Sequence, residues 1–344
     1  MSMTILDSEL KEIRTYLEKA ENPLVFFDDD HDGLSSYILI KKEFEKIHGT
    51  VIKGGTKDEN IYFNKIQEYN PDLILILDRA EISQELIDSV NVPLIWLDHH
   101  PVLDRKGVKY YNPRIHDPED TRATSYWAYK LTKKDLWIAM VGIIGDYHLP
   151  EDLIKDFEYK ELFNNKTEHE DILYNSDFGK FVKIFNFILK GTTTEVKKNI
   201  NLLCKIKTPY EILNQETPAG KSLFKSYEKI NIEYEKLLNN GIKSANDNKL
   251  LLFTYPDSKV SLSAGISSEL KYRFPDKLVI VAREKDDYMR TSLRCNNLIL
   301  QPILKKALDG LDGYGGGHDH AVGAQINVKD FSKFIENIKK QINA

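Results

Sequence analysis

The sequence predicts an α/β protein with a parallel, doubly wound N-terminal sheet domain, a helical connector, and a smaller mixed-sheet α/β C-terminal domain. Three observations predict it. Short apolar runs alternate with helical segments over residues 1–150, the pattern of a parallel sheet with helices on both faces. Residues 151–245 are helical, lysine-rich and poor in strand signals. Residues 246–344 return to alternating strands and helices, with two neighbouring strand signals that suggest a hairpin.

The first domain opens with an amphipathic helix over residues 4–20, where apolar residues recur near a 3.6-residue period. The predicted strands are residues 24–27, 50–52, 73–77, 94–97 and 108–111. The predicted helices that follow are residues 34–48, 58–69, 83–90, 123–131 and 135–147. Gly49 is expected to end the first of these helices. The last is apolar nearly all round, so it should be buried.

The second half is expected to begin with a connector, in which residues 219–240 form one long helix. Turn-rich sequence at 239–248 marks the boundary with the last domain. There the predicted strands are residues 250–255, 278–283, 288–295 and 321–328, and the predicted helices are 261–273, 298–309 and 329–342. Residues 313–318, Gly-Tyr-Gly-Gly-Gly-His, are expected to form a glycine-rich loop.

Composition narrows the class of protein. With 344 residues the chain can bury a large core without disulfides, and its two cysteines, Cys204 and Cys295, lack metal-site spacing. We therefore expect a cytoplasmic protein. No stretch approaches the length of a membrane span. The net charge of −5 argues against bulk electrostatic binding to long nucleic acid, although it does not exclude a local basic groove.

Acidic residues follow three of the predicted strands, at Asp28, Asp78 and Asp98. Because the carboxyl ends of parallel strands lie along one edge of a sheet, these side chains are expected to converge. Extended residues alternate sides, so Asp30 and Asp32 are expected to face the same way as Asp28. A further carboxylate, Asp146, ends the buried helical segment 135–147.

So many carboxylates in one place are unfavourable unless cations compensate them. Together with His99, they form an oxygen and imidazole ligand set that suits Mn²⁺ or Mg²⁺ better than Zn²⁺. Four or more acids suggest two ions, an arrangement that supports in-line displacement at phosphorus. The alternatives are helix caps for the single aspartates and a calcium loop for residues 28–33, but the later glycine and glutamate of that loop are missing.

A candidate anion site lies in the C-terminal domain. The three glycines Gly315, Gly316 and Gly317 before His318 allow backbone N–H groups to cradle an anion, and Arg294 can bind a phosphate with two hydrogen bonds. The alternative is a flexible loop with a surface ion pair. Two interpretations also stay open for residues 121–125: Arg122 contacts a phosphate, or the segment simply starts a helix.

The constellation resembles the DHH phosphoesterase superfamily. The matching motifs are Asp28-x-Asp30-x-Asp32-Gly33, Asp78 after a strand, Asp98-His99-His100, and Gly145-Asp146. Residues 292–294 and 315–318, with Ala321 and Gly323 after them, are similar to the DHH-associated domain found in RecJ-like exonucleases and nanoRNases. The resemblance spans nearly the whole chain, and the helical connector is the part least covered.

The resemblance implies roles for individual residues. The implied metal ligands are Asp30, Asp32, Asp78, His99 and Asp146, with Asp78 as the bridge between ions and as a catalytic residue. Asp98 would not bind an ion itself but would orient His99 through a hydrogen bond, while His100 would contact the scissile phosphate. Phe26 departs from the family, because many members carry a histidine there, and Asp28 is the candidate replacement ligand.

The resemblance also implies an activity: Mn²⁺-dependent phosphodiesterase and exonuclease action on short single-stranded oligonucleotides by a two-metal mechanism, releasing mononucleotides. One alternative is a phosphoesterase for cyclic dinucleotides or 3′-phosphoadenosine 5′-phosphate. Another is a silent scaffold protein in replication or repair. The sequence is compatible with a homodimer and leaves cleavage polarity and the choice between RNA and DNA open.

Overall fold

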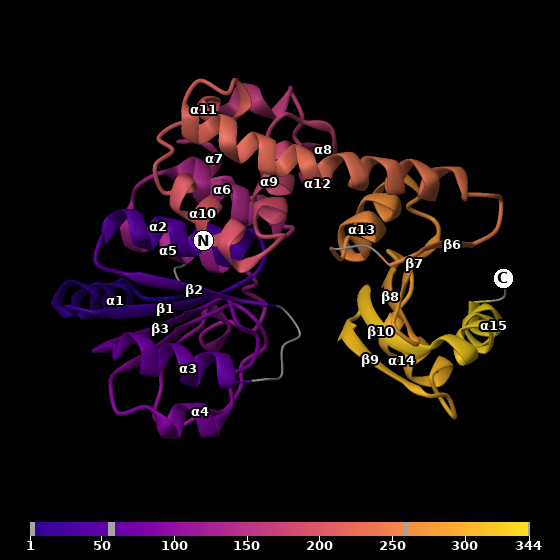
Figure 1. Ribbon diagram of the computed structural model, residues 1–344, viewed down its shortest axis with the longest axis horizontal. Coiled ribbons are helices and arrows are strands. Elements are labelled where there is room, and N and C mark those ends of the chain that lie inside the picture. The colour runs from indigo at the N-terminus through magenta and orange to yellow at the C-terminus, as the bar shows by residue number, and fades with distance from the viewer. Residues whose placement is uncertain (1–3, 54–58, 258–259, 343–344) are drawn as a thin grey trace. The chain divides into compact units, whose positions relative to one another are not determined.

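The computed structural model describes residues 4–53, 59–257 and 260–342, and the chain divides into two compact units, Met1–Tyr227 and Glu228–Ala344 (Figure 1). Helix α12 (Pro218–Lys243) begins in the first unit and runs into the second. Helices of the segment predicted as a connector, such as α8 (His169–Asn175) and α9 (Gly179–Ile188), pack on α6 (Leu136–Gly145) of the first unit. The three-domain division at 150 and 245 stays a prediction.

The sheet of the first unit has five parallel strands in the order β2-β1-β3-β4-β5, as the strand–helix alternation predicted. Its strands are β1 (Pro23–Asp28), β2 (His48–Ile52), β3 (Leu73–Leu77), β4 (Leu94–Leu97) and β5 (Lys109–Tyr111). Phe27 pairs with Leu77, and Leu77 pairs with Leu97, so these three strands end side by side. All five residues of β3 are buried, because the strand is covered on both faces.

Helices cover both faces of this sheet, with α3 and α4 on one side and α2, α5 and α6 on the other (Figure 1). The helices of the unit not yet given bounds are α1 (Asp7–Lys19), α2 (His31–Glu43), α3 (Asn60–Tyr69), α4 (Gln84–Ser89), α5 (Thr124–Thr132), α7 (Glu151–Ile154), α10 (Thr193–Leu203) and α11 (Tyr210–Leu213), with 3₁₀ turns η1 (Pro113–Ile115) and η2 (Lys160–Phe163). Phe26 is fully buried on the α3 side, its ring 4.7 Å from that of Tyr62, so it is a core residue.

The prediction that Gly49 ends a helix is wrong. Helix α2 ends at Glu43, and Gly49 lies inside β2, paired with Val25. A Cβ atom at Gly49 would stand 2.2 Å from the ring of Tyr37, so the glycine makes room for a helix side chain packed on the strand. The helix also starts three residues earlier than expected, at His31, because Asp30 caps it.

The second unit holds a mixed sheet in the order β6-β7-β8-β10-β9. Its strands are β6 (Leu250–Tyr255), β7 (Leu278–Lys285), β8 (Tyr288–Arg294), β9 (Gly313–His318) and β10 (Ala321–Asn327). Strands β6 and β7 are parallel, and the remaining pairs are antiparallel, including the predicted hairpin β7–β8. The helices are α13 (Ser263–Arg273), α14 (Leu300–Ala307) and α15 (Phe331–Ile342), after the 3₁₀ turn η3 (Val328–Asp330).

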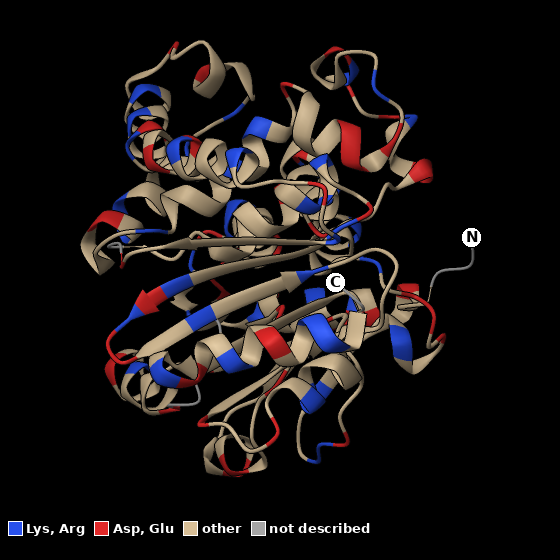
Figure 2. Cartoon of the chain, turned by 90° about the vertical axis from the view of Figure 1, so that its right-hand side faces the viewer, with Lys and Arg blue, Asp and Glu red and all other residues tan. Residues whose placement is uncertain are grey.

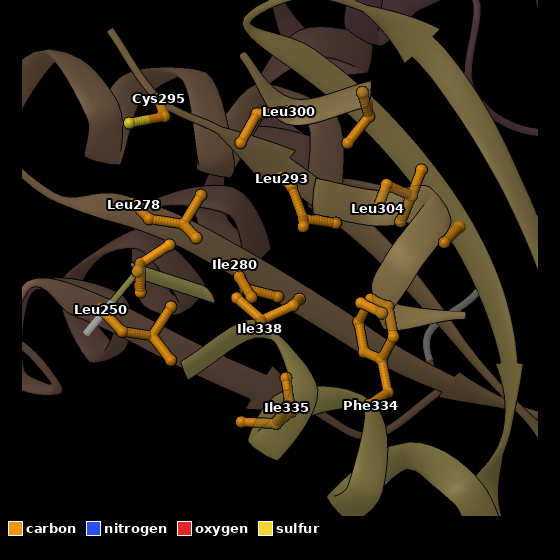
Figure 3. Close-up of a cluster of buried hydrophobic side chains, with 14 of the residues drawn as sticks. Leu250, Leu278, Ile280, Leu293, Cys295, Leu300, Leu304, Phe334, Ile335 and Ile338 are labelled. Atoms are coloured by element: carbon orange, nitrogen blue, oxygen red, sulfur yellow. The ribbon is translucent and has the colours of Figure 1, made fainter. Parts of the chain in front are cut away.

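One core holds this unit together. Figure 3 shows Leu278 and Ile280 of β7 and Leu293 of β8 meeting Leu304 of α14 and Phe334 of α15. The glycine-rich segment predicted as a loop is strand β9, which pairs with β10 through the register Gly317 with Val322. Glycine is depleted in strands, so composition alone favours a loop here.

Among the described helices, none combines the length and apolar character that crossing a membrane requires.

Candidate metal centre

Three aspartates stand where β1, β3 and β4 end. Asp28 is the last residue of β1, while Asp78 and Asp98 directly follow β3 and β4. Asp78 has a φ of 57°, a left-handed conformation that turns the chain out of the strand, and its side chain is buried. The predicted convergence of these segments at one edge follows from the parallel register of their strands.

Two helix N-termini position the next carboxylates. Asp30 caps α2 and accepts hydrogen bonds from the backbone N–H groups of Asp32 (3.0 Å) and Gly33 (2.9 Å). Asp32 is buried and accepts the backbone N–H groups of Thr124 (2.8 Å) and Ser125 (2.9 Å) at the start of α5. The positive end of a helix dipole stabilises a carboxylate in this place.

His99 faces two acids with one ring nitrogen. Its Nε2 lies 3.4 Å from Oδ1 of Asp78 and 3.4 Å from Oδ2 of Asp146, which caps the C-terminus of α6. Its Nδ1 lies 3.2 Å from the carbonyl oxygen of Thr121. Because a carbonyl only accepts, Nδ1 carries a proton, and Nε2 is the ring atom that faces the acids: it donates to them when the ring is protonated and offers a lone pair to a cation when the ring is neutral.

The acids raise the pKa of His99 well above its ordinary value. Burial acts the other way, but the charges of Asp146, Asp78 and Asp32 outweigh it. Burial also raises the pKa of Asp146 to about 6, helped by Asp32, and burial with Asp32 and Asp30 raises the pKa of Asp78 well above its ordinary value. The cluster therefore holds more negative charge than the fold neutralises.

Two overlapping groups fit a divalent cation. One comprises Asp32, His99 and Asp146, the other Asp78, His99 and His100, and the ligand atoms of each group lie within 4.8 Å of one another. Carboxylate oxygens with an imidazole nitrogen are a donor set for Mn²⁺ or Mg²⁺. The fixed tautomer of His99 and the uncompensated carboxylates agree with such an ion.

Asp28 and Asp30, both predicted as ligands, fall outside these two groups. Asp28 forms an ion pair with Arg79 at the end of β3. Burial and Asp30 raise the pKa of Asp28 to about 7, although Arg79 opposes the shift. For Asp30, burial is outweighed by His31 and the N–H of Gly33, so its pKa is lowered. Their role as ligands stays a prediction.

Asp98 holds His100, whereas the sequence led us to expect that it steadies His99. The carboxylate of Asp98 is fully buried and accepts from Nδ1 of His100 at 2.7 Å and from its backbone N–H at 3.0 Å. Tyr110 and Asn112 each donate to the same carboxylate at 3.3 Å. Adjacent histidines point in different directions, so only the fold decides which one the acid meets.

The segment before α5 supports the centre, and sequence reasoning did not assign it this role. Thr121 orients His99, and Thr124 donates from Oγ1 to Asp78 at 3.3 Å while its N–H holds Asp32. Arg122 is buried and bonded to Asp120 (Nε to Oδ1, 2.9 Å) and to Tyr126, so its contacts are structural. A Thr-Ser pair at a helix start was the available signal, but its carboxylate partner lies far away in the chain.

The predicted anion-binding residues lie in the second unit. Arg294 at the end of β8 donates to the hydroxyl of Ser268 (3.2 Å) and the carbonyl of Leu293 (2.9 Å). Gly315, Gly316 and Gly317 belong to the exposed strand β9. His318 lines a pocket with Gln301, Asp319, His320 and Ala321. Substrate binding by these residues stays a prediction.

The comparisons with known proteins agree with this architecture. Residues 247–344 match the family model of the DHHA1 domain. An uncharacterised protein of Methanocaldococcus jannaschii is 24% identical over 403 aligned residues, which cover 91% of each chain.

Two solved structures are similar over nearly the whole chain. RecJ of Thermus thermophilus, in complex with Mn²⁺, gives a TM-score of 0.70 at 17% identity, covering 99% of this chain and 55% of that one. An exonuclease RecJ bound to manganese gives a TM-score of 0.67 at 18% identity, covering 96% of this chain and 94% of that one. The chain thus spans about half of the Thermus RecJ. The chain therefore shares the fold of these RecJ structures, and its residues 247–344 match the DHHA1 domain.

Proposed function

We propose that the chain is a metal-dependent phosphodiesterase that removes mononucleotides from short single-stranded oligonucleotides, using two divalent ions, Mn²⁺ in preference to Mg²⁺. The observation that carries the proposal is the convergence of Asp78 and Asp146 on Nε2 of His99, with Asp32 in the same ligand group as His99 and Asp146. RecJ, with which the chain shares its fold, is described as an exonuclease and binds manganese.

Asp32, Asp78, His99 and Asp146 would hold the ions, with Asp28 and Asp30 as further predicted ligands. When bound, such ions polarise the phosphoryl oxygens and lower the pKa of water, so that attack at phosphorus occurs near neutral pH. Backbone groups of α5 and of Thr121 hold two of these side chains, Asp32 and His99, in place. Fixed donors and acceptors need no reorganisation during the reaction.

His100 has a separate role in this proposal. Its Nδ1 is engaged by the buried Asp98, which leaves Nε2 to donate a proton or a hydrogen bond to a phosphate oxygen. Asp98 fixes the orientation of the ring, as buried acids do beside catalytic histidines. The charge that develops on the phosphate in the transition state would then meet a hydrogen-bond donor held in place by the fold.

Charge distribution favours short substrates. The chain carries a net charge of −5, and acidic and basic residues are interspersed in the view of Figure 2. Long single strands are held by continuous basic grooves that neutralise many phosphates. A few phosphates beside a metal centre need no such groove.

The test is turnover of end-labelled oligonucleotides of increasing length with Mn²⁺, analysed for mononucleotide release, beside a cyclic dinucleotide and 3′-phosphoadenosine 5′-phosphate. Asp78→Asn should reduce turnover at least about 100-fold, more than the loss of a residue that only orients a metal ligand usually costs. Asp88→Asn, the same change on the exposed face of α4, is the control and should behave as wild type. Full activity of Asp78→Asn would refute the metal assignment, and tight Mn²⁺ binding with no turnover of any substrate would favour a scaffold protein.

A further inference from the structure

Tyr147, the residue after Asp146, stands at a helix end in a conformation that suits glycine. The backbone N–H of Tyr147 donates to the carbonyl oxygen of Ile144 (3.3 Å), and the backbone N–H of His148 donates to the carbonyl oxygen of Ile143 (3.1 Å). These two bonds form a Schellman motif, whose central residue is left-handed and usually glycine. Tyr147 has a φ of 59° there. A bulky residue costs free energy in this place, and such outliers cluster at functional sites.

The ring of Tyr147 is held from one side by helix α8. Its hydroxyl lies 2.6 Å from that of Tyr174, and its ring centroid lies 5.2 Å from that of His169, with 40° between the planes. His169 is itself fixed by a 2.7 Å contact from Nε2 to the carbonyl of Ile144. Nearly half of the tyrosine, 47%, remains exposed. An aromatic ring is thus kept rigid while part of its surface stays open.

Tyr147 directly follows a residue of the candidate metal centre. Asp146 belongs to the ligand group with Asp32 and His99, and consecutive Cα atoms are only about 3.8 Å apart. A nucleotide whose phosphate lies at that group would bring its base near Tyr147. Bases stack on aromatic side chains irrespective of sequence, because every base has a π face.

We propose that Tyr147 is a stacking platform for the base of the nucleotide whose phosphate is cleaved, and that it makes the centre select nucleotides over phosphodiesters without a base. The inference rests on the proposed function, because it assumes a nucleotide phosphate at Asp146. This role explains why a tyrosine occupies a position where glycine would be unstrained. The ring, held by its contacts with α8, is then available to a base next to Asp146.

The experiment uses the full chain and a pair of short oligonucleotides that differ only in an intact or an abasic terminal nucleotide. Tyr147→Gly should raise KM for the intact substrate about tenfold or more and change KM for the abasic one little. It should also relieve the left-handed strain, and the lost contacts with Tyr174 and His169 offset part of the gain in melting temperature. Tyr147→Phe, which keeps the ring, should retain the preference for the intact substrate.

Lys133→Gly is the matched control. Lys133 is also left-handed at a helix C-terminus, with a φ of 58° at the end of α5. Its replacement should relieve strain in the same way and leave KM for both substrates unchanged. A gain in stability of Lys133→Gly without a change in base preference would then show the effect of the backbone strain alone.

The two proposals fail in different ways. The stacking role would be overturned if Tyr147→Gly had the KM of the wild type for the intact substrate, or if its KM rose equally for both substrates. Calorimetry with a nucleoside monophosphate and with deoxyribose 5-phosphate gives a readout without turnover. If wild type hydrolyses neither oligonucleotide but binds the monophosphate more tightly through Tyr147, the proposed function is wrong and the stacking role stands.

Discussion

Asp28 and Arg79 join the ends of the neighbouring strands β1 and β3 by an ion pair. The two side chains are 23% and 11% exposed, so water screens the pair only in part. Arg79 gives the acidic edge a cation of its own, and it binds the acid that we expected to replace the family's histidine. Phe26, at the histidine's position, lies instead in the core beside Tyr62.

Removal of this cation should destabilise the fold. We predict that, at a pH above the pKa of Asp28 (about 7), Arg79→Met lowers the free energy of unfolding by about 3 kcal/mol, because an ionised, partly buried carboxylate loses its partner. The double variant Asp28→Asn with Arg79→Met should recover most of the loss. Urea denaturation in the presence of a chelator measures both. Lys46→Met breaks the exposed pair with Glu21 and should cost at most about 1 kcal/mol; a cost that small for Arg79→Met would contradict the prediction.

The raised pKa values of two carboxyl groups predict that the fold becomes less stable as the pH rises. The pKa values of Asp28 (about 7) and Asp146 (about 6) are raised, so the folded chain binds protons more tightly than the unfolded chain does. With a chelator present, the melting temperature should therefore fall as pH rises from about 5 to about 8, since the stabilising protons are lost through these pKa values.

Two comparisons check this pH dependence. Saturating Mn²⁺ should flatten it, because an ion stabilises the deprotonated ligands. Asp146→Asn should reduce the slope without any ion. A melting temperature that rises steadily over the same pH range in chelator would contradict the prediction.

At the level of elements, β9 shows that a strand can be built mostly of glycine. A Cβ atom at Gly317 would lie 2.5 Å from the carbonyl oxygen of Ala321, and φ there is 139°. A Cβ atom at Gly315 would lie 2.6 Å from the carbonyl oxygen of Gly323. The partner strand β10 therefore leaves no room for side chains at these two positions.

The glycines of β9 offer a matched pair of substitutions. We predict that Gly317→Ala lowers the stability of the second unit by about 1–3 kcal/mol, because alanine rarely adopts this backbone conformation and its Cβ atom would clash with the carbonyl oxygen of Ala321. Gly316→Ala meets no atom within 4 Å and should change stability by less than about 0.5 kcal/mol. Thermal denaturation and hydrogen exchange of the β9 amides measure the difference. Equal effects would show that β9 is not held as described.

At the scale of the whole molecule, the two units have separate cores, and the candidate ligands all belong to Met1–Tyr227. We predict two transitions in calorimetry, of which Mn²⁺ raises only that of the first unit. An ion at 100 times its Kd contributes about 2.7 kcal/mol to the unit that binds it. Asp78→Asn should abolish the shift. A shift of the second transition in that variant would place an ion elsewhere.

The sequence by itself determined the α/β class, strand β3 at Leu73–Leu77 and the acidic edge of the sheet. These features are local, because a buried strand is an apolar run and its end is marked by the aspartate that follows. Parallel pairing then brings the ends together without further information. The DHH resemblance followed from the same residues, and it agrees with the RecJ-like fold and with the DHHA1 match at residues 247–344.

Only the tertiary structure decided the partners of the individual side chains. Asp32 meets N–H groups 92 and 93 residues away, and Asp28 meets Arg79 51 residues away. The choice of His100 by Asp98 depends on which way two adjacent rings turn. Such pairings depend on how helices pack on the sheet, and no local periodicity records that packing. The tertiary fold thus brought Asp32, Asp78 and Asp146 of the predicted acidic group to His99 and fixed two of these side chains through backbone groups.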